Sequence, residues 1–307
     1  MAIDWKKEMP ELDARADEPM AGHTTFKIGG PARWILRPRN TAEAAQILRL
    51  CRREGIVPFY LGNGSNLLAA DEGYGGVVLS TRRLEGLEEQ AGRISAGSGV
   101  SLARLANFAL ERGLTGLEFA QGIPGSVGGG LRMNAGAYGG ELAQVTEWVE
   151  CLDGEGNLHR LDADQCEFSY RHSLFCRNGY LVVAGGFRLL SGEKEAIRGR
   201  MEEYARRRRE KQPLEFPSAG STFKRPPGDY AAALIDRCGL KGLRIGDAQV
   251  SEKHGGFLVN RGNATAAEML ELMAEVRRRV REATGVTLEP EVELLPPELA
   301  EKLDGGK

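Results

Sequence analysis

Residues 122–140 read Gly-Ile-Pro-Gly-Ser-Val-Gly-Gly-Gly-Leu-Arg-Met-Asn-Ala-Gly-Ala-Tyr-Gly-Gly. Ten glycines fall in the wider range from Gly113 to Gly140. Residues 122–140 also include Ile, Val, Leu, Met and Tyr, which flexible Gly/Ser linkers rarely contain. Glycine permits positive φ and lets the backbone approach a bulky ligand closely. Backbone N–H groups exposed in this way form anion-binding nests, so the stretch predicts a folded loop that suits a pyrophosphate.

A second glycine cluster, Gly-Asn-Gly-Ser-Asn-Leu-Leu at 62–68, directly follows a predicted strand at 56–61. It lacks the third glycine of a dinucleotide-binding fingerprint and no amphipathic helix follows it, so a Rossmann fold is a poor match. The pattern Gly-x-x-x-x-Gly-Lys-Ser/Thr is absent too, which argues against a nucleoside triphosphatase. Either cluster alone could be a tight turn inside a β-rich domain. Two such loops in one chain favour a large phosphorylated ligand.

The composition of the 307 residues is that of a globular protein, apart from the 41 glycines. Hydrophobic residues make up 41% and charged residues 27%, and the longest apolar runs are far shorter than the ~20 residues that span a membrane. The 41 basic and 43 acidic residues leave a net charge of −2, which gives no reason to expect a nucleic-acid or membrane surface. The five cysteines and four histidines show no metal-binding spacing, so we predict reduced thiols and no metal site.

Hydrophobic periodicity predicts a mixture of helices and strands. Helices are expected at 41–54, with Asn40 and Glu43 as a capping box, at 101–112, and at 266–282, with Thr265 and Glu268 as a capping box. Strands are expected at 56–61, 76–80, 145–152, near Leu158 and at 180–190, the third and fourth of these forming a hairpin around Asp-Gly-Glu-Gly-Asn.

A basic run, Arg206–Arg209, ends another predicted helix that starts near Glu193. We expect it to form the exposed C-terminal turns of that helix, where cations suit the macrodipole; the alternative is a grip on an anionic ligand. The composition then shifts at Gln-Pro-Leu-Glu-Phe-Pro, residues 212–217, which predicts a domain boundary.

Taken in order, six motifs make the chain resemble the MurB family of UDP-N-acetylenolpyruvoylglucosamine reductases over about residues 20–295. They are Thr-Phe-Lys-Ile-Gly-Gly-Pro-Ala at 25–32, the two glycine clusters, Tyr-Arg-His-Ser at 170–173, Pro-Ser-Ala-Gly-Ser-Thr-Phe-Lys at 217–224 and Leu-Glu-Pro-Glu-Val at 288–292. The resemblance implies an α+β fold: a two-lobed FAD-binding domain of the vanillyl-alcohol oxidase (PCMH) type plus a smaller α/β substrate-binding domain. It places an N-terminal extension at 1–20, the FAD-binding lobes at 21–80 and 81–211, and the substrate-binding domain at 212–307.

The resemblance also implies the activity. With FAD as cofactor and NADPH as electron donor, the family reduces the enolpyruvyl ether of UDP-N-acetylglucosamine to UDP-N-acetylmuramate, a cytoplasmic step of peptidoglycan synthesis. Hydride addition to this group builds negative charge beside the substrate carboxylate, which a cation and a carboxylic acid can absorb. By resemblance these are Arg171 and Glu291, and Ser221 is the acid that protonates the neighbouring carbon. Without the family context, each of these side chains would be read as a cap or a solvated group.

Further residues follow from the same resemblance. Those expected to bind the cofactor are Gly62, Asn63, Gly64, Ser65, Asn66, Leu67, Gly122, Ile123, Pro124, Gly125, Ser126, Gly129, Asn134 and Gly136. Those expected to bind the substrate are Tyr170, Lys224, Arg225, Lys241 and Arg244, with surface charge as the alternative for the four cations.

The chain departs from the family pattern in a few places. Gly130 replaces an alanine and Arg225 replaces an asparagine of many members. No tyrosine-bearing loop is inserted in the last domain, which suggests the shorter subtype of the family. His254 is expected to be a structural histidine rather than a catalyst.

Two other classes of function stay open at this stage. One is a flavin-dependent oxidase on the same scaffold, although the glycine loops contain no histidine to tether FAD. The other is a non-catalytic flavin- or nucleotide-sugar-binding protein, which would not need Arg171, Ser221 and Glu291 together. Residues 1–7 lack the pattern of a secretory signal, so we predict a cytoplasmic protein whose partner is a small-molecule nucleotide sugar, with no nucleic acid, membrane or obligate protein partner.

Overall fold

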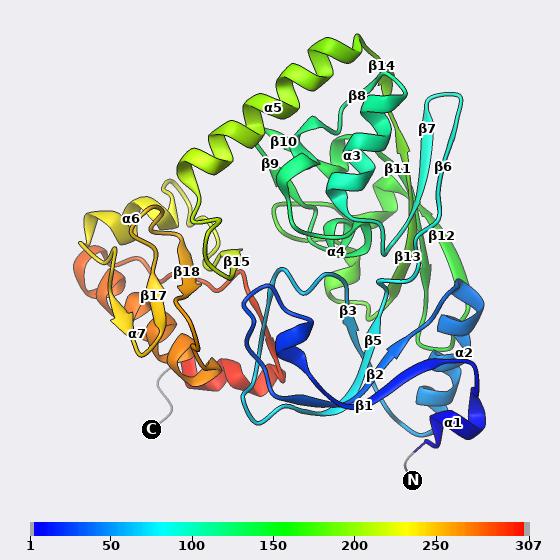
Figure 1. Cartoon of the computed structure of the whole chain (residues 1–307), viewed down its shortest axis with the longest axis horizontal. Coiled ribbons are helices and arrows are strands. Elements are labelled where there is room, and N and C mark those ends of the chain that lie inside the picture. The colour runs from blue at the N-terminus through cyan, green and yellow to red at the C-terminus, as the bar shows by residue number, and fades with distance from the viewer. Residues whose placement is uncertain (1–2, 304–307) are drawn as a thin grey trace. The chain divides into compact units, whose positions relative to one another are not determined.

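The structure is a computed structural model that describes residues 3–303 (Figure 1). Its helices are α1 Trp5–Glu8, α2 Thr41–Arg53, α3 Leu102–Glu111, α4 Val127–Arg132, α5 Lys194–Lys211, α6 Ala231–Arg237 and α7 Ala266–Thr284. Its strands are β1 Asp13–Pro19, β2 Pro31–Arg37, β3 Phe59–Leu61, β4 Leu67–Ala69, β5 Tyr74–Ser80, β6 Leu87–Gln90, β7 Arg93–Gly97, β8 Leu114–Thr115, β9 Gly136–Ala137, β10 Gly140–Glu141, β11 Thr146–Leu152, β12 Leu158–Asp162, β13 Leu181–Arg188, β14 Leu190–Ser191, β15 Ser218–Ser221, β16 Arg244–Ile245, β17 Ala248–Val250, β18 Phe257–Asn260 and β19 Glu293–Leu295.

The chain divides into two compact units, each built from separate stretches of sequence. The first unit consists of the chain up to Ala16, Trp34–Asn63 and Gly76–Arg208. The second consists of Asp17–Arg33, Gly64–Gly75 and the chain from Arg209 onward. The sequence analysis, by contrast, divides the chain into domains that are each one continuous stretch. Those limits describe functional lobes, and they stay a prediction.

An antiparallel sheet with the order β12-β11-β13-β7-β6 forms the centre of the first unit. The predicted hairpin is confirmed as β11 and β12, in which Leu152 pairs with Leu158. The predicted helix at 101–112 is confirmed as α3: the Ser101 side chain accepts a hydrogen bond from the Arg104 N–H, and Leu105 lies on its buried face. The apolar residues of the sheet, α3 and α4 share one hydrophobic cluster.

A second hydrophobic cluster in the first unit contains α2 and the buried Trp5. The Asn40 side chain caps α2, accepting a hydrogen bond from the Glu43 N–H at 2.9 Å. The reciprocal half of the predicted capping box differs, because the Glu43 carboxylate accepts from the Arg39 N–H at 2.8 Å and not from the Asn40 N–H. The strand predicted at 56–61 is shorter, because it begins only at Phe59. The Ile56 N–H closes the end of α2 by donating to the Cys51 carbonyl, and proline at 58 has no N–H to give to a sheet.

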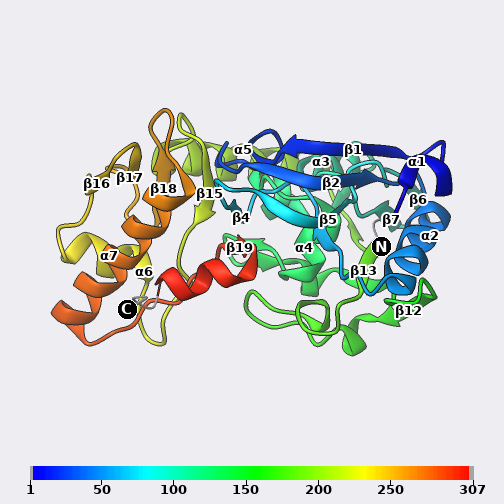
Figure 2. The same cartoon turned by 90° about the horizontal axis from the view of Figure 1, so that it is seen from below.

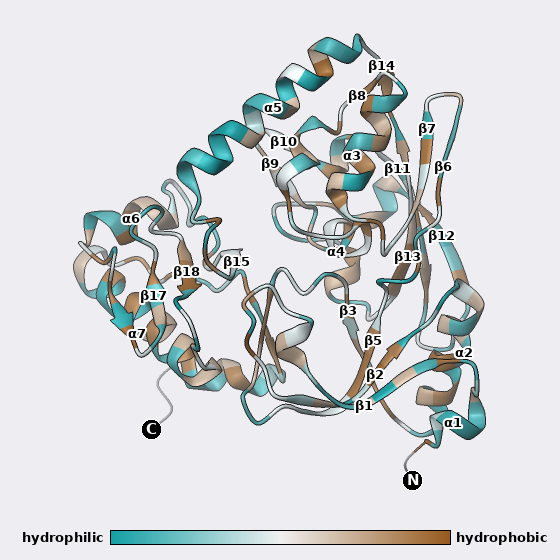
Figure 3. Cartoon of the chain, in the orientation of Figure 1, coloured by the Kyte–Doolittle hydropathy of each residue, from teal (hydrophilic) through white to brown (hydrophobic). Residues whose placement is uncertain are grey.

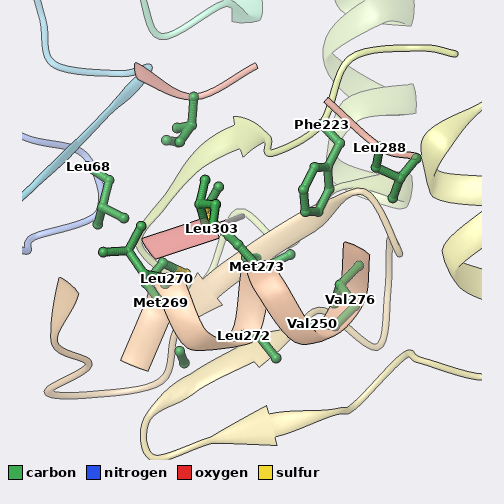
Figure 4. Close-up of a cluster of buried hydrophobic side chains, with 14 of the residues drawn as sticks. Leu68, Phe223, Val250, Met269, Leu270, Leu272, Met273, Val276, Leu288 and Leu303 are labelled. Carbon is green, nitrogen blue, oxygen red and sulfur yellow. The ribbon is translucent and has the colours of Figure 1, made fainter. Parts of the chain in front are cut away.

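The second unit packs α7 against an antiparallel sheet with the order β15-β18-β17-β16. Thr265 and Glu268 form the predicted capping box, and α7 continues to Thr284, where Gly285 adopts positive φ. Met269 and Met273 of α7 pack with Phe223 in the core of this unit (Figure 4). The C-terminal 3₁₀ segment, Pro297–Leu303, also contacts α7 (Figure 2).

No helix among residues 3–303 has the length and apolar character needed to cross a membrane. Across the same residues, no group of three or more His, Cys, Asp or Glu side chains is arranged to hold a metal ion.

Asp71 also caps α7, from a distant part of the chain. Its two carboxylate oxygens accept hydrogen bonds from the N–H groups of Ala266 and Ala267, at 2.8 and 3.0 Å. We expect Asp71→Ala to lower the free energy of unfolding by about 1–2 kcal/mol, because the first turn of α7 loses both acceptors and a favourable charge.

Urea denaturation monitored by circular dichroism measures this change. The neighbouring Glu72→Ala is the control and should change stability by less than about 0.5 kcal/mol. Equal effects of the two variants would contradict the capping role of Asp71.

Candidate functional site

The two predicted glycine loops lie against each other in the first unit. A Cβ atom on Gly62 would lie 2.6 Å from the Ser126 hydroxyl oxygen, so a side chain there would force that hydroxyl, which caps α4, to move. The Asn63 side-chain amide donates a hydrogen bond to the Pro124 carbonyl at 3.3 Å, and Arg82 donates one to the Asn63 carbonyl at 3.1 Å. The structure therefore brings together two segments that are about sixty residues apart in sequence.

Main-chain hydrogen bonds hold the second glycine loop, residues 122–129, on the segment between β7 and α3. The Val127 N–H donates to the Val100 carbonyl, the Gly128 N–H to the Ser98 carbonyl, and the Leu102 N–H to the Gly125 carbonyl. The loop then enters the short helix α4, capped by Ser126. Within this loop a Cβ on Gly129 would meet one atom, 3.8 Å away, whereas a Cβ on Gly128 would lie 2.7 Å from the Ser98 Cβ.

Three buried polar atoms near these loops have no hydrogen-bond partner among the described residues: the hydroxyls of Ser80 and Ser98 and the Gln121 side-chain oxygen. Buried polar atoms in folded proteins are nearly always hydrogen-bonded, so such a group marks a place where a ligand or water supplies the partner. Ser98 and Gln121 belong to the segments joined by the contacts above. The loops therefore fit a large polar ligand such as a dinucleotide.

Four predicted residues lie together in the first unit, after the end of α4 and in the segment at 170–171: Asn134, Gly136, Tyr170 and Arg171. The buried Asn134 amide donates to the Ser169 carbonyl at 3.1 Å, and its oxygen accepts from the Ala143 N–H at 2.9 Å. Arg171 donates to the Gly136 carbonyl at 3.3 Å and has a positive φ of 53°. Both the amide nitrogen and the oxygen of Asn134 are hydrogen-bonded within the protein. The Asn134 side chain therefore stabilises the turn that carries Arg171.

The first glycine loop continues into the second unit at Gly64. Gly64 has a φ of +63°, and a Cβ there would lie 2.0 Å from the His23 carbonyl oxygen. Its own carbonyl accepts a hydrogen bond from the Thr25 N–H at 3.0 Å. The motifs at 25–32 and 62–68 are thus joined through backbone that has no space for a side chain.

Asn66 connects this loop to the segment that carries Glu291. The Asn66 amide donates to the Glu291 carbonyl at 3.0 Å, and the Asn66 carbonyl accepts from the Glu293 N–H at 3.0 Å. Directly after these residues β4 and β19 pair in parallel, with Leu67 opposite Glu293.

Ser221 and Glu291 are brought side by side in the second unit, although 70 residues separate them. The Glu291 N–H donates to the carbonyl of Thr222, the residue after Ser221, at 2.8 Å, and Phe223 pairs with Pro290 in an antiparallel bridge. Gly220 precedes Ser221 with a φ of +76° and has open space around its α-carbon. The site places a partly exposed hydroxyl next to the backbone of a partly exposed carboxyl residue.

The four cations predicted to bind the substrate also lie in the second unit. Lys224 is 3.7 Å from a Glu289 carboxylate oxygen, and Lys241 donates to Asp236 at 2.7 Å. Arg244 is paired with Asp247. Arg225 stacks over the exposed Tyr230 ring at 4.4 Å. Their ion pairs on partly exposed side chains are weak enough to be exchanged for a phosphate.

His254 is a partly buried, hydrogen-bonded histidine. Its Nδ1 accepts a hydrogen bond from the Gly256 N–H at 3.2 Å, and its ring packs edge-on against Phe257. Burial lowers the pKa of His254 from its usual 6.5, and the positive charges of Lys241 and Lys211 act in the same direction. The imidazole is therefore neutral at pH 7.

The expectation that residues 206–209 form exposed helical turns is wrong for Arg208, which is 8% exposed. The face of α5 explains this, because Ile197 and Met201 are buried at a spacing of four residues and Tyr204 and Arg208 continue the same stripe. That spacing was the available signal, hidden by the run of four arginines. Gln121 was also missed, because nothing in a sequence shows that a glutamine oxygen will be buried.

Comparisons with known proteins define the class of protein. Residues 32–162 match the model of an FAD binding domain. The crystal structure of Phl p 4, a grass pollen allergen with glucose dehydrogenase activity, shares the fold over 61% of this chain and 43% of its own, with a TM-score of 0.50 at 18% identity. The chain is a flavoprotein, and its predicted fold, an FAD-binding domain of the vanillyl-alcohol oxidase type with a second, smaller domain, is confirmed.

Closer relatives identify the family. Residues 212–295 match the model of the UDP-N-acetylenolpyruvoylglucosamine reductase C-terminal domain. Proteins with that name from Clostridium novyi and Heliobacterium modesticaldum are each 47% identical to this chain, covering 97% and 94% of it and 98% and 92% of themselves. The crystal structure of the enzyme (MurB) from Thermus caldophilus has a TM-score of 0.79 at 37% identity, covering 92% of this chain and 98% of its own. The chain belongs to the UDP-N-acetylenolpyruvoylglucosamine reductase family.

Gly64 generates the first prediction from the site. We expect Gly64→Ala to lower the free energy of unfolding by more than about 1 kcal/mol. The positive φ is unfavourable for alanine, and its Cβ would clash with the His23 carbonyl. Urea denaturation of the protein without added cofactor measures the change. Gly75→Ala is the matched control, since nothing lies within 4 Å of a Cβ there. If both variants are as stable as the natural protein, the close approach at Gly64 is not a constraint.

His254 generates a prediction about pH. In the unfolded chain the His254 imidazole binds a proton near pH 6.5, whereas in the folded protein its pKa is lower. Protonation therefore favours the unfolded chain, and the free energy of unfolding should fall as the pH drops from 7.5 to 5.5. His254→Gln removes this group and should reduce the fall. Urea midpoints at the two pH values test it, and an unchanged difference between them in the variant would contradict the lowered pKa.

Proposed function

We propose that the chain reduces UDP-N-acetylenolpyruvoylglucosamine to UDP-N-acetylmuramate, with FAD as cofactor and NADPH as electron donor. The observation that carries this proposal is the position of Ser221 beside the Glu291 segment, through the hydrogen bond from the Glu291 N–H to the Thr222 carbonyl. Family membership supplies the reaction, and this contact supplies an acid and a carboxyl group at neighbouring positions. When bound, FAD supplies the hydride that adds to the terminal carbon of the enolpyruvyl group.

Arg171 and Glu291 would act on the substrate carboxylate. Hydride addition leaves negative charge that spreads from the reacting carbon into this carboxylate. A guanidinium and a carboxylic acid that donate to its oxygens stabilise that charge, and donors aimed at developing charge are usually the largest catalytic contribution. The rigid turn that holds Arg171, through its bond to the Gly136 carbonyl, would keep the guanidinium oriented.

Ser221 would deliver the proton that completes the reduction. A serine hydroxyl is a weak acid, but the carbon next to the ether is strongly basic once the hydride has been added. Gly220, with its positive φ, sets the backbone so that Ser221 ends strand β15 at the Glu291 segment. Proton transfer from a positioned group typically contributes about 10²–10⁴-fold to the rate.

The remaining residues would bind the two nucleotides. Gly62 and Asn63, with the loop from Gly122 to Gly129, would hold FAD through backbone N–H groups. Ser65 and Asn66 would add side-chain hydrogen bonds. The cations Lys224, Arg225, Lys241 and Arg244 and the exposed Tyr170 would bind the UDP part of the substrate. A reaction on a nucleotide sugar places the protein in the cytoplasm, and this chemistry requires no protein, nucleic-acid or membrane partner.

An anaerobic experiment in two steps tests this function. The purified protein should be yellow and should lose its flavin absorbance when NADPH is added without oxygen. Adding the enolpyruvyl sugar nucleotide should then restore the absorbance. Reoxidation by oxygen but not by the sugar nucleotide would indicate an oxidase instead, and a colourless protein that binds UDP sugars would indicate a non-catalytic binding protein.

Ser221→Ala separates the two steps. We expect reduction by NADPH to be nearly unchanged, and reoxidation by the enolpyruvyl sugar nucleotide to slow by about 10²–10⁴-fold because the proton donor is missing. Stopped-flow absorbance of the flavin measures both. Ser218→Ala, in the same strand, is the control and should leave both steps intact. An equal loss in both steps for Ser221→Ala would contradict the role of proton donor.

A further inference from the structure

Arg171 lies in a tight turn whose backbone is unfavourable for a residue with a side chain. The Ser169 N–H donates to the His172 carbonyl at 3.0 Å and the His172 N–H donates to the Ser169 carbonyl at 3.2 Å, so Tyr170 and Arg171 are the two residues of the turn. Arg171 has a φ of 53°, in the region where turns normally have glycine or asparagine. An arginine stays in this conformation only where neighbouring contacts fix it, and such strain is concentrated at functional sites.

The segment that follows α4 supplies contacts to this turn. α4 packs against α3, β13 and the 3₁₀ turn Leu174–Cys176, and Figure 3 shows it beside the first two. After the end of α4, the Asn134 side chain donates to the Ser169 carbonyl at the entrance of the turn. The Gly136 carbonyl accepts a hydrogen bond from the Arg171 guanidinium. The entrance of the turn and its guanidinium are therefore both held by the same short stretch of chain.

Ser173 joins the exit of the turn to this stretch as well. Its hydroxyl donates to the Arg132 carbonyl at 2.7 Å, and the residue is 0% exposed. Arg132 is the last residue of α4, where helix carbonyls have no partner within the helix. Serine is a preferred N-cap, and Ser173 precedes the 3₁₀ turn Leu174–Cys176, yet its side chain makes no cap hydrogen bond there. The hydroxyl is used instead to join two segments that are 41 residues apart.

Residues 132–136 thus hold the turn at its entrance, at its guanidinium and at its exit. Arg171 is the cation assigned to the substrate carboxylate in the proposed function. We propose that Ser173 is a positioning residue for Arg171: its hydrogen bond to the Arg132 carbonyl keeps the guanidinium aimed at the substrate carboxylate. Ser173 is fully buried, so it acts through Arg171 and not by touching the substrate. This inference rests on the proposed function and adds a residue to its machinery.

This role predicts which step depends on Ser173. The step with NADPH builds no charge on the substrate carboxylate, so it does not need the guanidinium to be aimed. Hydride addition to the enolpyruvyl group spreads negative charge into that carboxylate, and a hydrogen bond weakens steeply when its donor turns away. The carboxylate is charged before the reaction, but its charge grows in the transition state. A misdirected guanidinium should therefore slow the reaction of bound substrate more than it weakens substrate binding.

Ser173→Ala tests this role in the two half-reactions. We expect reduction by NADPH to change by less than about twofold, and the maximal rate of reoxidation by the enolpyruvyl sugar nucleotide to fall about tenfold. The sugar-nucleotide concentration that gives half of this rate should change by less than about threefold. Stopped-flow flavin absorbance at several concentrations measures all three values. Equal slowing of both steps, or an unchanged maximal rate of reoxidation, would overturn the proposal.

A measurement without substrate or turnover reports the turn itself. Trypsin cleaves after arginine when the backbone opens locally, and mass spectrometry identifies the cut after Arg171. We expect this cut to form about three- to tenfold faster in Ser173→Ala, because one buried hydrogen bond that closes the turn is lost. An unchanged rate of cleavage would overturn the anchoring role of Ser173.

Cys176→Ala is the matched control. The Cys176 thiol donates to the same Arg132 carbonyl at 3.1 Å, three residues further from the turn. The variant removes a donor to that carbonyl but keeps the exit of the Arg171 turn fixed, so both half-reactions should stay within about twofold of the natural protein. A slowing of reoxidation in Cys176→Ala equal to that in Ser173→Ala would overturn the proposal, because the end of α4 alone would then explain it.

A double-mutant cycle with Arg171→Met separates positioning from a general structural effect. If Ser173 acts through Arg171, Ser173→Ala should slow reoxidation by less than about twofold once residue 171 is methionine. The same tenfold slowing in both backgrounds, about 1.4 kcal/mol, would overturn the proposal.

Ser173→Cys keeps a weaker donor of similar size and should give a reoxidation rate between those of the natural protein and Ser173→Ala. If Ser173→Ala does not retain FAD, Ser173→Cys replaces it, and reoxidation as fast as in the natural protein would then overturn the proposal. A failure of this inference differs from a failure of the proposed function. In the first case the natural protein and the Ser173 variant are reoxidised by the sugar nucleotide at the same rate. In the second case the natural protein itself is not reoxidised, and the inference is overturned together with that function.

Discussion

The close approach of Gly62 to Ser126 is the contact on which the arrangement of the two glycine loops in the first unit depends. The backbone at Gly62 approaches the Ser126 hydroxyl so closely that a Cβ atom would lie 2.6 Å from it. The Asn63 side-chain amide also donates a hydrogen bond to the Pro124 carbonyl, so two contacts join the loops. A phosphorylated ligand is bound best by main-chain donors, because they are fixed by the fold and cost little entropy to align. In these loops, glycine thus allows two backbone segments to approach closely.

In the second unit, hydrogen bonds between distant segments place Ser221 and Glu291. Ser221 and Glu291 are neighbours because the Thr222 carbonyl accepts a hydrogen bond from the Glu291 N–H, and Asn66 holds the other side of the Glu291 segment. The first contact joins two main-chain groups and the second joins the Asn66 side-chain amide to a main-chain carbonyl, and both connect segments far apart in sequence. Small changes in the supporting strands would therefore move the hydroxyl and the carboxyl group together, and their mutual geometry would be kept.

Arg208 and Asp71 are charged residues whose importance comes from burial or position and not from their type. Arg208 lies beside Gly122 without a carboxylate partner among the described residues, and Asp71 accepts two N–H groups from the start of α7. Burial removes the Arg208 charge from water, and the Asp71 charge interacts favourably with the N-terminal end of a helix. Arg207 and Glu72, nearby residues of the same types, lie at exposed positions.

The sequence by itself determined the features that depend on neighbours along the chain. The caps of α2 and α7, the helix α3 and the hairpin of β11 and β12 were predictable, because a helix cap, an amphipathic period and a turn act within a few residues of the chain. The order of the motifs determined the family in the same way. Only the tertiary structure decided that Gly122 makes room for Arg208, that Asp71 caps α7 and that β3 begins at Phe59. The first two features arise from contacts between segments that are distant in sequence. The third arises because the end of α2 uses the Ile56 N–H. Neither cause leaves a periodic pattern in the sequence.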